Sequence, residues 1–537
     1  MKCHAKKLYT NGKIVTMDAE NTIASAVIVS GDRIDAVGDE TELLSLGHQQ
    51  IERIDLSGNT LYPGFIDSHS HLSMYASWKK YVYCGGISNL NDALHKLSMH
   101  AKNNPDVPFI VGYGFDDTDI PEQRGPDIHE MDAVCPDRPA MLVHISVHAA
   151  YINTRMFDVL GIPHDEPSTD IDVICRDGLP TGLVTELVAF KAMNVLPSLS
   201  LEELKNALLK SVSDYNAQGF TGTIGGGAGL AGISPFMLTR ALFQLEREGR
   251  LNLNVYMPYI GNRYDEVEAT GLLDGVGTPL VQPAGIKLLV DGSIQAYTAA
   301  IPEGYYSRPE VKPGIIGTQK ELNDRVYAVH AAGKQVVVHG NGNGAIEAII
   351  TAVERAQARC PREDPRHLLI HCQMASDGQL ERMKVAGIWP SFFGLHVWNW
   401  GDRHRDIFLG PERAARIDPC GSAVRLGLPF SLHADTPVLP QMTMLSIHTV
   451  VNRITKSGKE LGPDQRVSPL EAMRAYTTYA AAMCFSEHRR GSIEPGKLAD
   501  FTLLGDDPCT VPPLKIRDIP ILAAVSSGRL VWGSFKN

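Results

Sequence analysis

The stretch Leu61-Tyr-Pro-Gly-Phe-Ile-Asp-Ser-His-Ser-His71 is a short apolar run that ends in two histidines. Side chains two residues apart point to the same face of a β-strand, so the imidazoles of His69 and His71 leave the strand end in one direction. Neutral imidazole nitrogen is a preferred ligand of zinc and similar metals. The stretch therefore predicts a strand that delivers two metal ligands, although paired histidines also occur as ordinary surface residues.

Seven further short apolar runs alternate with amphipathic segments, which is the pattern of repeated βα units around a parallel sheet. With residues 61–67 they make eight, the number that a (β/α)8 barrel requires. The runs are residues 222–226, 253–260, 285–291, 335–339, 367–371, 388–393 and 430–435. We therefore predict the α/β class, with a TIM-like barrel over residues 61–480.

A long segment separates the first two predicted strands, and one crossover helix would need far fewer residues. Residues 75–210 are therefore predicted to form a large insertion over the mouth of the barrel. Within it, residues 108–113 and 140–145 are strand-like, and a helix is predicted across residues 201–218. Long insertions at such a place shape substrate access.

Both ends of the chain are rich in short strand-like segments. Asn11-Gly12 is a hairpin signal near the start, and residues 491–504 and 521–532 are strand-like near the end. Because short hairpins need partners in water, we predict that residues 1–60 and 481–537 together form one small β-sandwich.

Composition and charge disfavour several classes of protein. The chain has 537 residues, is 44% hydrophobic and carries a net charge of −11, which does not suit a nucleic-acid partner. No apolar run is long enough to predict a membrane span. Nine dispersed cysteines, and a start without the apolar core of a signal peptide, predict reduced thiols and a cytoplasmic protein.

Polar side chains gather at the predicted carboxyl ends of the strands, where such barrels hold their active sites. His339 and His371 end the fifth and sixth strands, and His433 and Asp435 share one face of the eighth. With the two histidines of the first strand, this gives nitrogen and oxygen donors without thiolate, a set that suits hydrolytic Zn²⁺ or another divalent ion. Asp435 is then predicted to carry a proton from water to a leaving nitrogen, or to act as a plain ligand or as a carboxylate that orients a ligand.

The motif Pro63-Gly-Phe-Ile-Asp-Ser-His-Ser-His71 resembles the opening metal motif of the amidohydrolase superfamily. More narrowly, the chain resembles the branch that includes N-substituted formamide deformylase and the YtcJ-like hydrolases. The matching landmarks run nearly end to end. They are Asn153 in Ala-Ala-Tyr-Ile-Asn, Thr181-Gly-Leu-Val-Thr-Glu186, Lys287-Leu-Leu-Val-Asp-Gly292, residues 333–339, His371, Ala434-Asp-Thr-Pro437 and residues 491–500. The resemblance implies a β-sandwich, a distorted barrel and hydrolysis of an amide-type bond.

The same resemblance implies roles for individual residues. Lys287 matches a lysine that is carboxylated in many relatives and bridges two metals. Because an unmodified ammonium has no lone pair for a metal, Lys287 is either carboxylated, an electrostatic neighbour or a buried partner of Asp291. One or two divalent ions, Zn²⁺ in the first place, are expected. The implied metal ligands are His69, His71, Lys287, His339, His371 and Asp435.

The predicted insertion offers a further catalytic candidate. Relatives commonly read Asp-Gly-His where this chain has Ser146-Val-His148, so the resemblance places His148 against the substrate carbonyl or oxyanion, without the acid that would orient it. A purely structural histidine is the alternative. Trp400 is expected in an aromatic wall after the seventh strand. The substrate-binding candidates are Asn153, Glu186, Asp291, His396 and Trp398.

We therefore predict a metal-dependent hydrolase that cleaves the C–N bond of a small N-acyl or N-formyl amide by metal-activated water. An esterase, a carbamate hydrolase or a cyclic-amide hydrolase on the same site are the enzymatic alternatives. A non-catalytic scaffold is a further alternative. It is disfavoured because such a protein is expected to have lost metal ligands, and this chain keeps them. The expected partner is a small molecule, with no nucleic acid and no membrane. A homo-oligomer is compatible with the sequence, but no residue indicates one.

Overall fold

The computed structural model describes residues 6–45, 51–230, 232–273 and 277–535. At its centre lie eight parallel strands in chain order, each paired with the next. They confirm the predicted mixed α/β fold with a nearly closed, TIM-like barrel. The strands are β8 (Phe65–Ser70), β15 (Phe220–Gly225), β16 (Asn254–Ile260), β17 (Val281–Leu289), β18 (Val336–Gly340), β19 (His367–His371), β20 (Ile388–Phe393) and β21 (Ser431–His433).

The first and last strands of this sheet approach each other. Ser68 Oγ in β8 donates a hydrogen bond to the carbonyl of Leu432 in β21 over 2.9 Å. Just beyond both strands, the amide of His71 donates to the carbonyl of Thr436 over 2.8 Å. These bonds bring the carboxyl ends of β8 and β21 together, which matters because candidate ligands follow both.

Helices cover the outside of the barrel, and side chains within the barrel bury the inner face of its strands. Helix α7 (Leu201–Ala217) begins at a capping box in which Ser200 and Glu203 bond each other's backbone amides. Its apolar face, with Leu204 and Leu208, packs into the core cluster of the barrel. The predicted insertion therefore extends too far, because α7 belongs to the helices around the barrel. The other covering helices include α8 (Pro235–Arg247), α10 (Gln319–Ala331), α11 (Asn343–Arg359), α12 (Asp377–Ala386) and α16 (Thr443–Asn452).

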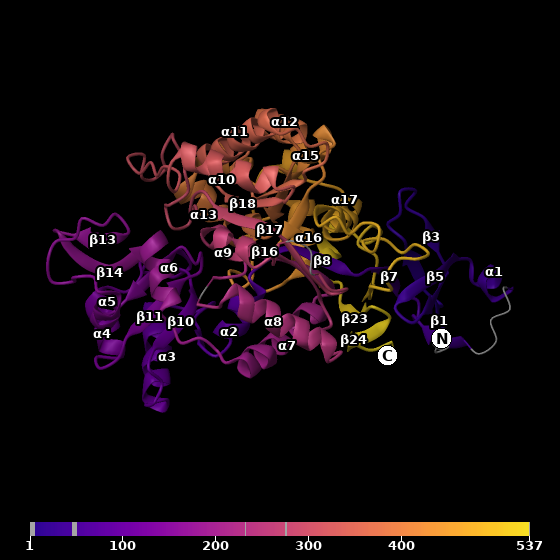
Figure 1. Cartoon of the computed structure of the whole chain (residues 1–537), viewed down its shortest axis with the longest axis horizontal. Helices are drawn as coiled ribbons and strands as arrows, with labels where there is room; N and C mark the ends of the chain where they lie inside the picture. The colour runs from indigo at the N-terminus through magenta and orange to yellow at the C-terminus, as the bar shows by residue number, and fades with distance from the viewer. Residues whose placement is uncertain (1–5, 46–50, 231, 274–276, 536–537) are drawn as a thin grey trace.

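The segment between β8 and α7 contains a six-stranded sheet of its own, at the left of Figure 1. The strand-like segments predicted within the insertion are two of its central strands, β10 and β11. The sheet has the order β13 (Val173–Arg176), β14 (Leu179–Thr185), β12 (Ala149–Ile152), β11 (Ala140–His144), β10 (Ile110–Phe115) and β9 (Val82–Tyr83).

Strands from the two chain ends lie together, at the right of Figure 1. Strand β7 (Thr60–Pro63) runs antiparallel to β22 (Phe501–Leu504), with Leu61 opposite Leu503. The predicted first barrel strand is thus divided, because Leu61 belongs to β7 and the barrel strand begins at Phe65. The two sheets are β5 (Arg33–Gly38), β4 (Ala26–Ser30), β1 (Lys6–Thr10) and β6 (Ile51–Asp55), and β24 (Arg529–Gly533), β23 (Ile521–Ser526), β22, β7, β2 (Lys13–Val15) and β3 (Ile23–Ala24).

One core joins these two sheets. It includes Val27 and Val29 from β4, together with Phe501 and Val525 from the C-terminal strands. Within residues 1–60, residues 1–5 and 46–50 lie outside the described residues. In the part of the chain that the structure describes, no helix is both long and apolar enough to cross a bilayer.

Candidate metal centre and active site

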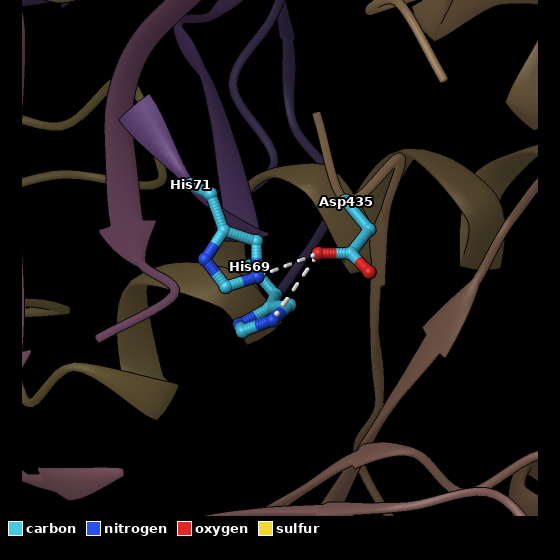
Figure 2. A group of neighbouring side chains, drawn as sticks. All are labelled: His69, His71 and Asp435. Carbon is cyan, nitrogen blue, oxygen red and sulfur yellow. Dashed lines mark ion pairs between the residues drawn. The ribbon is translucent and has the colours of Figure 1, made fainter. Parts of the chain in front are cut away.

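Strand β8 delivers His69 and His71 to the mouth of the barrel, and Asp435 reaches the same point from the segment after β21. Figure 2 shows the three side chains turned toward one another. The Nε2 atoms of both histidines lie 3.3 Å from Asp435 Oδ1. The ligand atoms of all three residues fall within 4.8 Å of one another, which is the spacing of a possible metal site.

A second pair of histidines lies at the ends of neighbouring strands. His339 ends β18 and His371 ends β19, and His339 Nδ1 is 3.1 Å from His371 Nε2. Lys287, on the adjacent strand β17, places Nζ 3.3 Å from His69 Nε2. The structure thus brings all six residues predicted as metal ligands to the carboxyl end of the barrel, in two groups with Lys287 next to the first.

Burial controls the protonation of this cluster. It lowers the pKa of His69, His339 and His371 well below the usual range of histidine, so these imidazoles are neutral. It also lowers the pKa of Lys287 to about 7. Neutral imidazoles have the lone pairs that metal binding requires, and a neutral amine is the form of lysine that reacts with carbon dioxide to form a carbamate.

The cluster has the properties expected of residues that hold a divalent cation. Burial favours the protonated form of Asp435, but the adjacent His71 holds the pKa of this carboxyl below its usual range. Asp435 Oδ1 and His69 Nδ1 are buried, and no hydrogen bond from the described residues reaches either atom. Buried polar atoms normally have a partner. The 3.3 Å separations also exceed those of charge-assisted hydrogen bonds, so an ion among these donors would complete the site.

His433 is a site residue whose role the sequence did not predict. Its Nε2 lies 3.2 Å from His371 Nδ1, and its Nδ1 lies 2.9 Å from Ser391 Oγ. Burial lowers the pKa of His433 to about 3, so the ring is neutral and orients His371 by hydrogen bonding. The available signal was the alternation that places His433 on the same strand face as Asp435.

His148 has the carboxylate partner that its sequence context lacks. Its Nδ1 lies 2.9 Å from Glu186 Oε2, and both side chains are buried. Burial alone would lower the pKa of His148, but the charge of Glu186 raises it. The ring centroid is 5.0 Å from that of His339, so His148 stands beside the metal-ligand candidates. Ser146 Oγ lies 2.7 Å from His144 Nδ1 and does not contact His148 through its hydroxyl oxygen except at the backbone amide.

Helix α13 (His396–Arg403) divides the predicted aromatic wall between two environments. His396 stacks on Phe393 with ring centroids 4.4 Å apart and an interplanar angle of 15°. His396 and Trp400 both line the cavity beside the candidate metal ligands. Trp398 points elsewhere, toward His448, and is corrected as a substrate-binding candidate. Residues two apart on a helix face different sides, whereas His396 and Trp400, four apart, share one.

Two further substrate-binding candidates have structural roles instead. Asn153 is fully buried and caps helix α5 (Thr154–Leu160); its Oδ1 accepts bonds from the amides of Ala140 and Met156. Its Nδ2 donates to the carbonyls of Cys135 and Arg138. No polar atom of this side chain is left for a substrate.

Asp291 is also fully buried. Its carboxylate accepts bonds from the backbone amides of Ala300, Asn341 and Gly342 over 2.8–3.0 Å. Burial raises the pKa of Asp291 to about 7, against the effect of these amides. Asp291 therefore fastens the loops after β17 and β18 to each other, and it is not a partner of Lys287 in the described structure.

Two neighbouring cavities lie near the cluster. A small chamber of about 30 Å³ is lined by His148, His339, His371, His396, Trp400 and Asp435, among others. A wider cleft of about 880 Å³ opens between the insertion sheet and residues 295–317. Gln295 lines both cavities. Glu186 lines the cleft and contacts His148, which lines the chamber.

Comparisons with known proteins agree with this arrangement. The model of the Amidohydrolase family matches residues 52–532. The chain is 30% identical over 539 residues to N-substituted formamide deformylase of Arthrobacter pascens, covering 97% of both chains. It is 26% identical over 543 residues to YtcJ of Bacillus subtilis, a provisionally named amidohydrolase, covering 98% of this chain and 99% of that one. An uncharacterized metal-dependent hydrolase of Pyrococcus horikoshii OT3 has the same fold, with a TM-score of 0.75 at 23% identity over 95% of this chain and 99% of that one.

Proposed function

The chain belongs to the amidohydrolase family, and on this premise we propose that it cleaves the C–N bond of a small N-formyl or N-acyl amide. The family match confirms the resemblance predicted from the motifs, and the chain is a hydrolase of non-peptide C–N bonds. The observation that carries the proposal is the buried meeting of His69, His71 and Asp435 at one rim of the barrel. The narrower substrate class follows the name of the Arthrobacter relative.

We propose Zn²⁺ as the metal, in one or two ions. His69, His71 and Asp435 would hold the first ion, and His339 and His371 the second. Lys287, once carboxylated, would supply a further ligand oxygen, because its Nζ lies next to His69. When bound, the metal supplies an activated water molecule and polarises the substrate carbonyl.

The other steps belong to side chains of the chain. Asp435 would accept the proton of the attacking water and pass it to the leaving nitrogen, since a buried carboxylate with a low pKa is ionised and ready to accept. His148 would donate a hydrogen bond to the carbonyl oxygen as negative charge develops there. Glu186 would hold Nδ1 of His148 and thereby direct Nε2 toward the substrate.

The two cavities suggest how an amide would lie. The chamber of about 30 Å³ has room for a carbonyl with a small substituent. The cleft of about 880 Å³ would take the larger group. Apolar side chains of the cleft, among them Ile171, Leu187 and Ile316, suit a hydrocarbon substituent. We further propose that residues 64–480 form the catalytic unit and that the described parts of residues 1–63, together with residues 481–535, form the supporting β-sandwich.

The test is elemental analysis of the purified protein together with a substrate panel. The panel contains N-formyl and N-acyl amides, cyclic amides, carbamates and esters, and amine or alcohol release is measured. Zinc in the protein and amine release from acyclic amides would support the proposal. Metal-loaded protein that releases amine from none of the amides would refute it. The variant Trp398→Phe, altered outside the chamber, is the matched control for substitutions within it.

A further inference from the structure

His396 presents a fixed hydrogen-bond acceptor to the chamber. Its Nδ1 lies 2.9 Å from Asp418 Oδ1, and both side chains are buried. A carboxylate oxygen accepts, so Nδ1 donates to Asp418, and in that tautomer Nε2 carries the lone pair. His396 lines the chamber, and no hydrogen bond from the described residues reaches its Nε2.

The acceptor is held rigidly. The imidazole lies parallel to the ring of Phe393, with centroids 4.4 Å apart. The backbone amide of Asp418 donates to the carbonyl of Gln373 over 2.9 Å, and the buried guanidinium of Arg453 donates to the carbonyl of Asp418 over 3.4 Å. A side chain fixed in this way loses little conformational entropy when it binds a ligand.

Strand order places this acceptor on the side of the leaving nitrogen. His396 follows β20, which pairs with β21, and Asp435 follows β21. His148 stands beside His339, which ends β18, two strands away from β20. An amide whose carbonyl oxygen faces His148 and whose nitrogen faces Asp435 therefore turns its nitrogen toward the wall that contains His396.

Building on the proposed function, we propose that His396 is a substrate-binding residue that accepts a hydrogen bond from the N–H of the scissile amide. Primary and secondary amides have this N–H. A tertiary amide replaces it with carbon, and an ester places an oxygen lone pair against the Nε2 lone pair. The dyad of His396 and Asp418 thus selects amides that carry an N–H over tertiary amides and esters.

The test compares the binding of three ligands that share one carbon skeleton: a secondary formamide, its N-methyl derivative and the matching formate ester. The ester removes the N–H without adding volume, which separates hydrogen bonding from crowding in the chamber. Dissociation constants are measured by calorimetry on metal-loaded Asp435→Asn protein, in which turnover is suppressed. We expect the secondary amide to bind about tenfold more tightly than either analogue.

Variants of His396 in the same background test the residue itself. In His396→Phe, an aromatic ring remains to stack on Phe393 but the acceptor is lost, so the three ligands should bind within about twofold of one another. In His396→Gln, the amide oxygen restores an acceptor and part of the preference should return. Trp398→Phe, on the same helix but outside the chamber, should retain the full preference.

Two results would overturn the inference: equal or undetectable binding of all three ligands, or a preference that His396→Phe leaves unchanged. Both are distinct from failure of the proposed function, which is the absence of amine release by the metal-loaded wild-type protein. The binding comparison needs no turnover, so it can be interpreted whichever way that experiment ends.

Discussion

At the scale of single residues, the candidate site combines neutral imidazoles with one ionised carboxylate. Burial keeps His69, His339 and His371 neutral, whereas His71 helps to keep Asp435 charged. A site of this composition attracts a cation without first having to lose protons from its histidines. The ionised carboxylate is then the group best placed to accept a proton during hydrolysis.

Replacing Asp435 with Asn should suppress turnover by about two to four orders of magnitude, because an amide cannot accept the proton of the attacking water. Most of the metal should remain, since the histidine donors are unchanged. The measurement is kcat together with the metal content of the purified variant. A fully active Asp435→Asn protein would show that another group carries the proton.

Replacing Glu186 with Gln should lower kcat by at least about tenfold and leave the metal content unchanged. The neutral amide no longer holds His148 by charge, and it can present a donor instead of an acceptor to Nδ1. The readout is the pH profile of kcat, which should lose its dependence on His148. Unchanged kinetics would return His148 to a structural role.

Replacing Asn153 with Ala should cost about 2–4 kcal/mol of stability, since it removes a helix cap and leaves buried backbone groups unpaired. KM of the remaining folded enzyme should not change. Urea denaturation and steady-state kinetics test both statements. A raised KM at unchanged stability would restore Asn153 as a substrate contact.

At this scale, the sequence predicted which residues lie near the site better than it predicted what their side chains contact. The histidines and Asp435 were found because their spacing places them at strand ends. Asn153 and Asp291 were misassigned, because a polar residue in a family landmark looks the same whether it binds substrate or backbone amides. The contact between His148 and Glu186 joins distant segments, and no local pattern encodes it.

At the scale of elements, the site depends on close approach of two loops. A Cβ atom added at Gly342, between β18 and α11, would lie 2.1 Å from the carbonyl oxygen of Ala300. The amides of both residues bond Asp291, so a shift of either loop would disturb the support beneath His339. Glycine is therefore required at this turn by lack of space.

The variant Gly342→Ala should lose about 1–3 kcal/mol of stability through this clash, and some of its metal. The matched control is Gly378→Ala in helix α12, where no atom lies within 4 Å of the added carbon. That change should be neutral or stabilise by up to about 1 kcal/mol, because alanine favours helix. The measurement is thermal denaturation of both variants. Equal denaturation midpoints for the two variants would contradict the predicted clash at Gly342.

The elements themselves were largely predictable from periodicity. The eight barrel strands are short apolar runs, buried on both faces, and each appears near its predicted position. The errors concern what each segment packs against. Residues 61–63 pair with β22, and α7 packs on the barrel, because long-range partners and not local sequence decide these memberships.

At the scale of the whole molecule, the metal ligands join strands that are far apart in sequence. An ion bound by His69, His71 and Asp435 would link the beginning and the end of the barrel. Removal of metal with a chelator should therefore lower both activity and the denaturation midpoint. Zinc at a hundred times its dissociation constant should restore about 2.7 kcal/mol. Calorimetry with and without the chelator measures the denaturation midpoint. An unchanged midpoint would show that metal binding does not stabilise the fold.

The pairing of β7 with β22 also has a consequence for how the protein is made. While the ribosome is still producing the barrel, β7 has emerged, but one of its edges has no neighbour until β22 follows the barrel. An open strand edge invites pairing with other chains. A nascent polypeptide released before β22 is made would keep that strand edge unpaired, so synthesis of β22 protects the enzyme against aggregation.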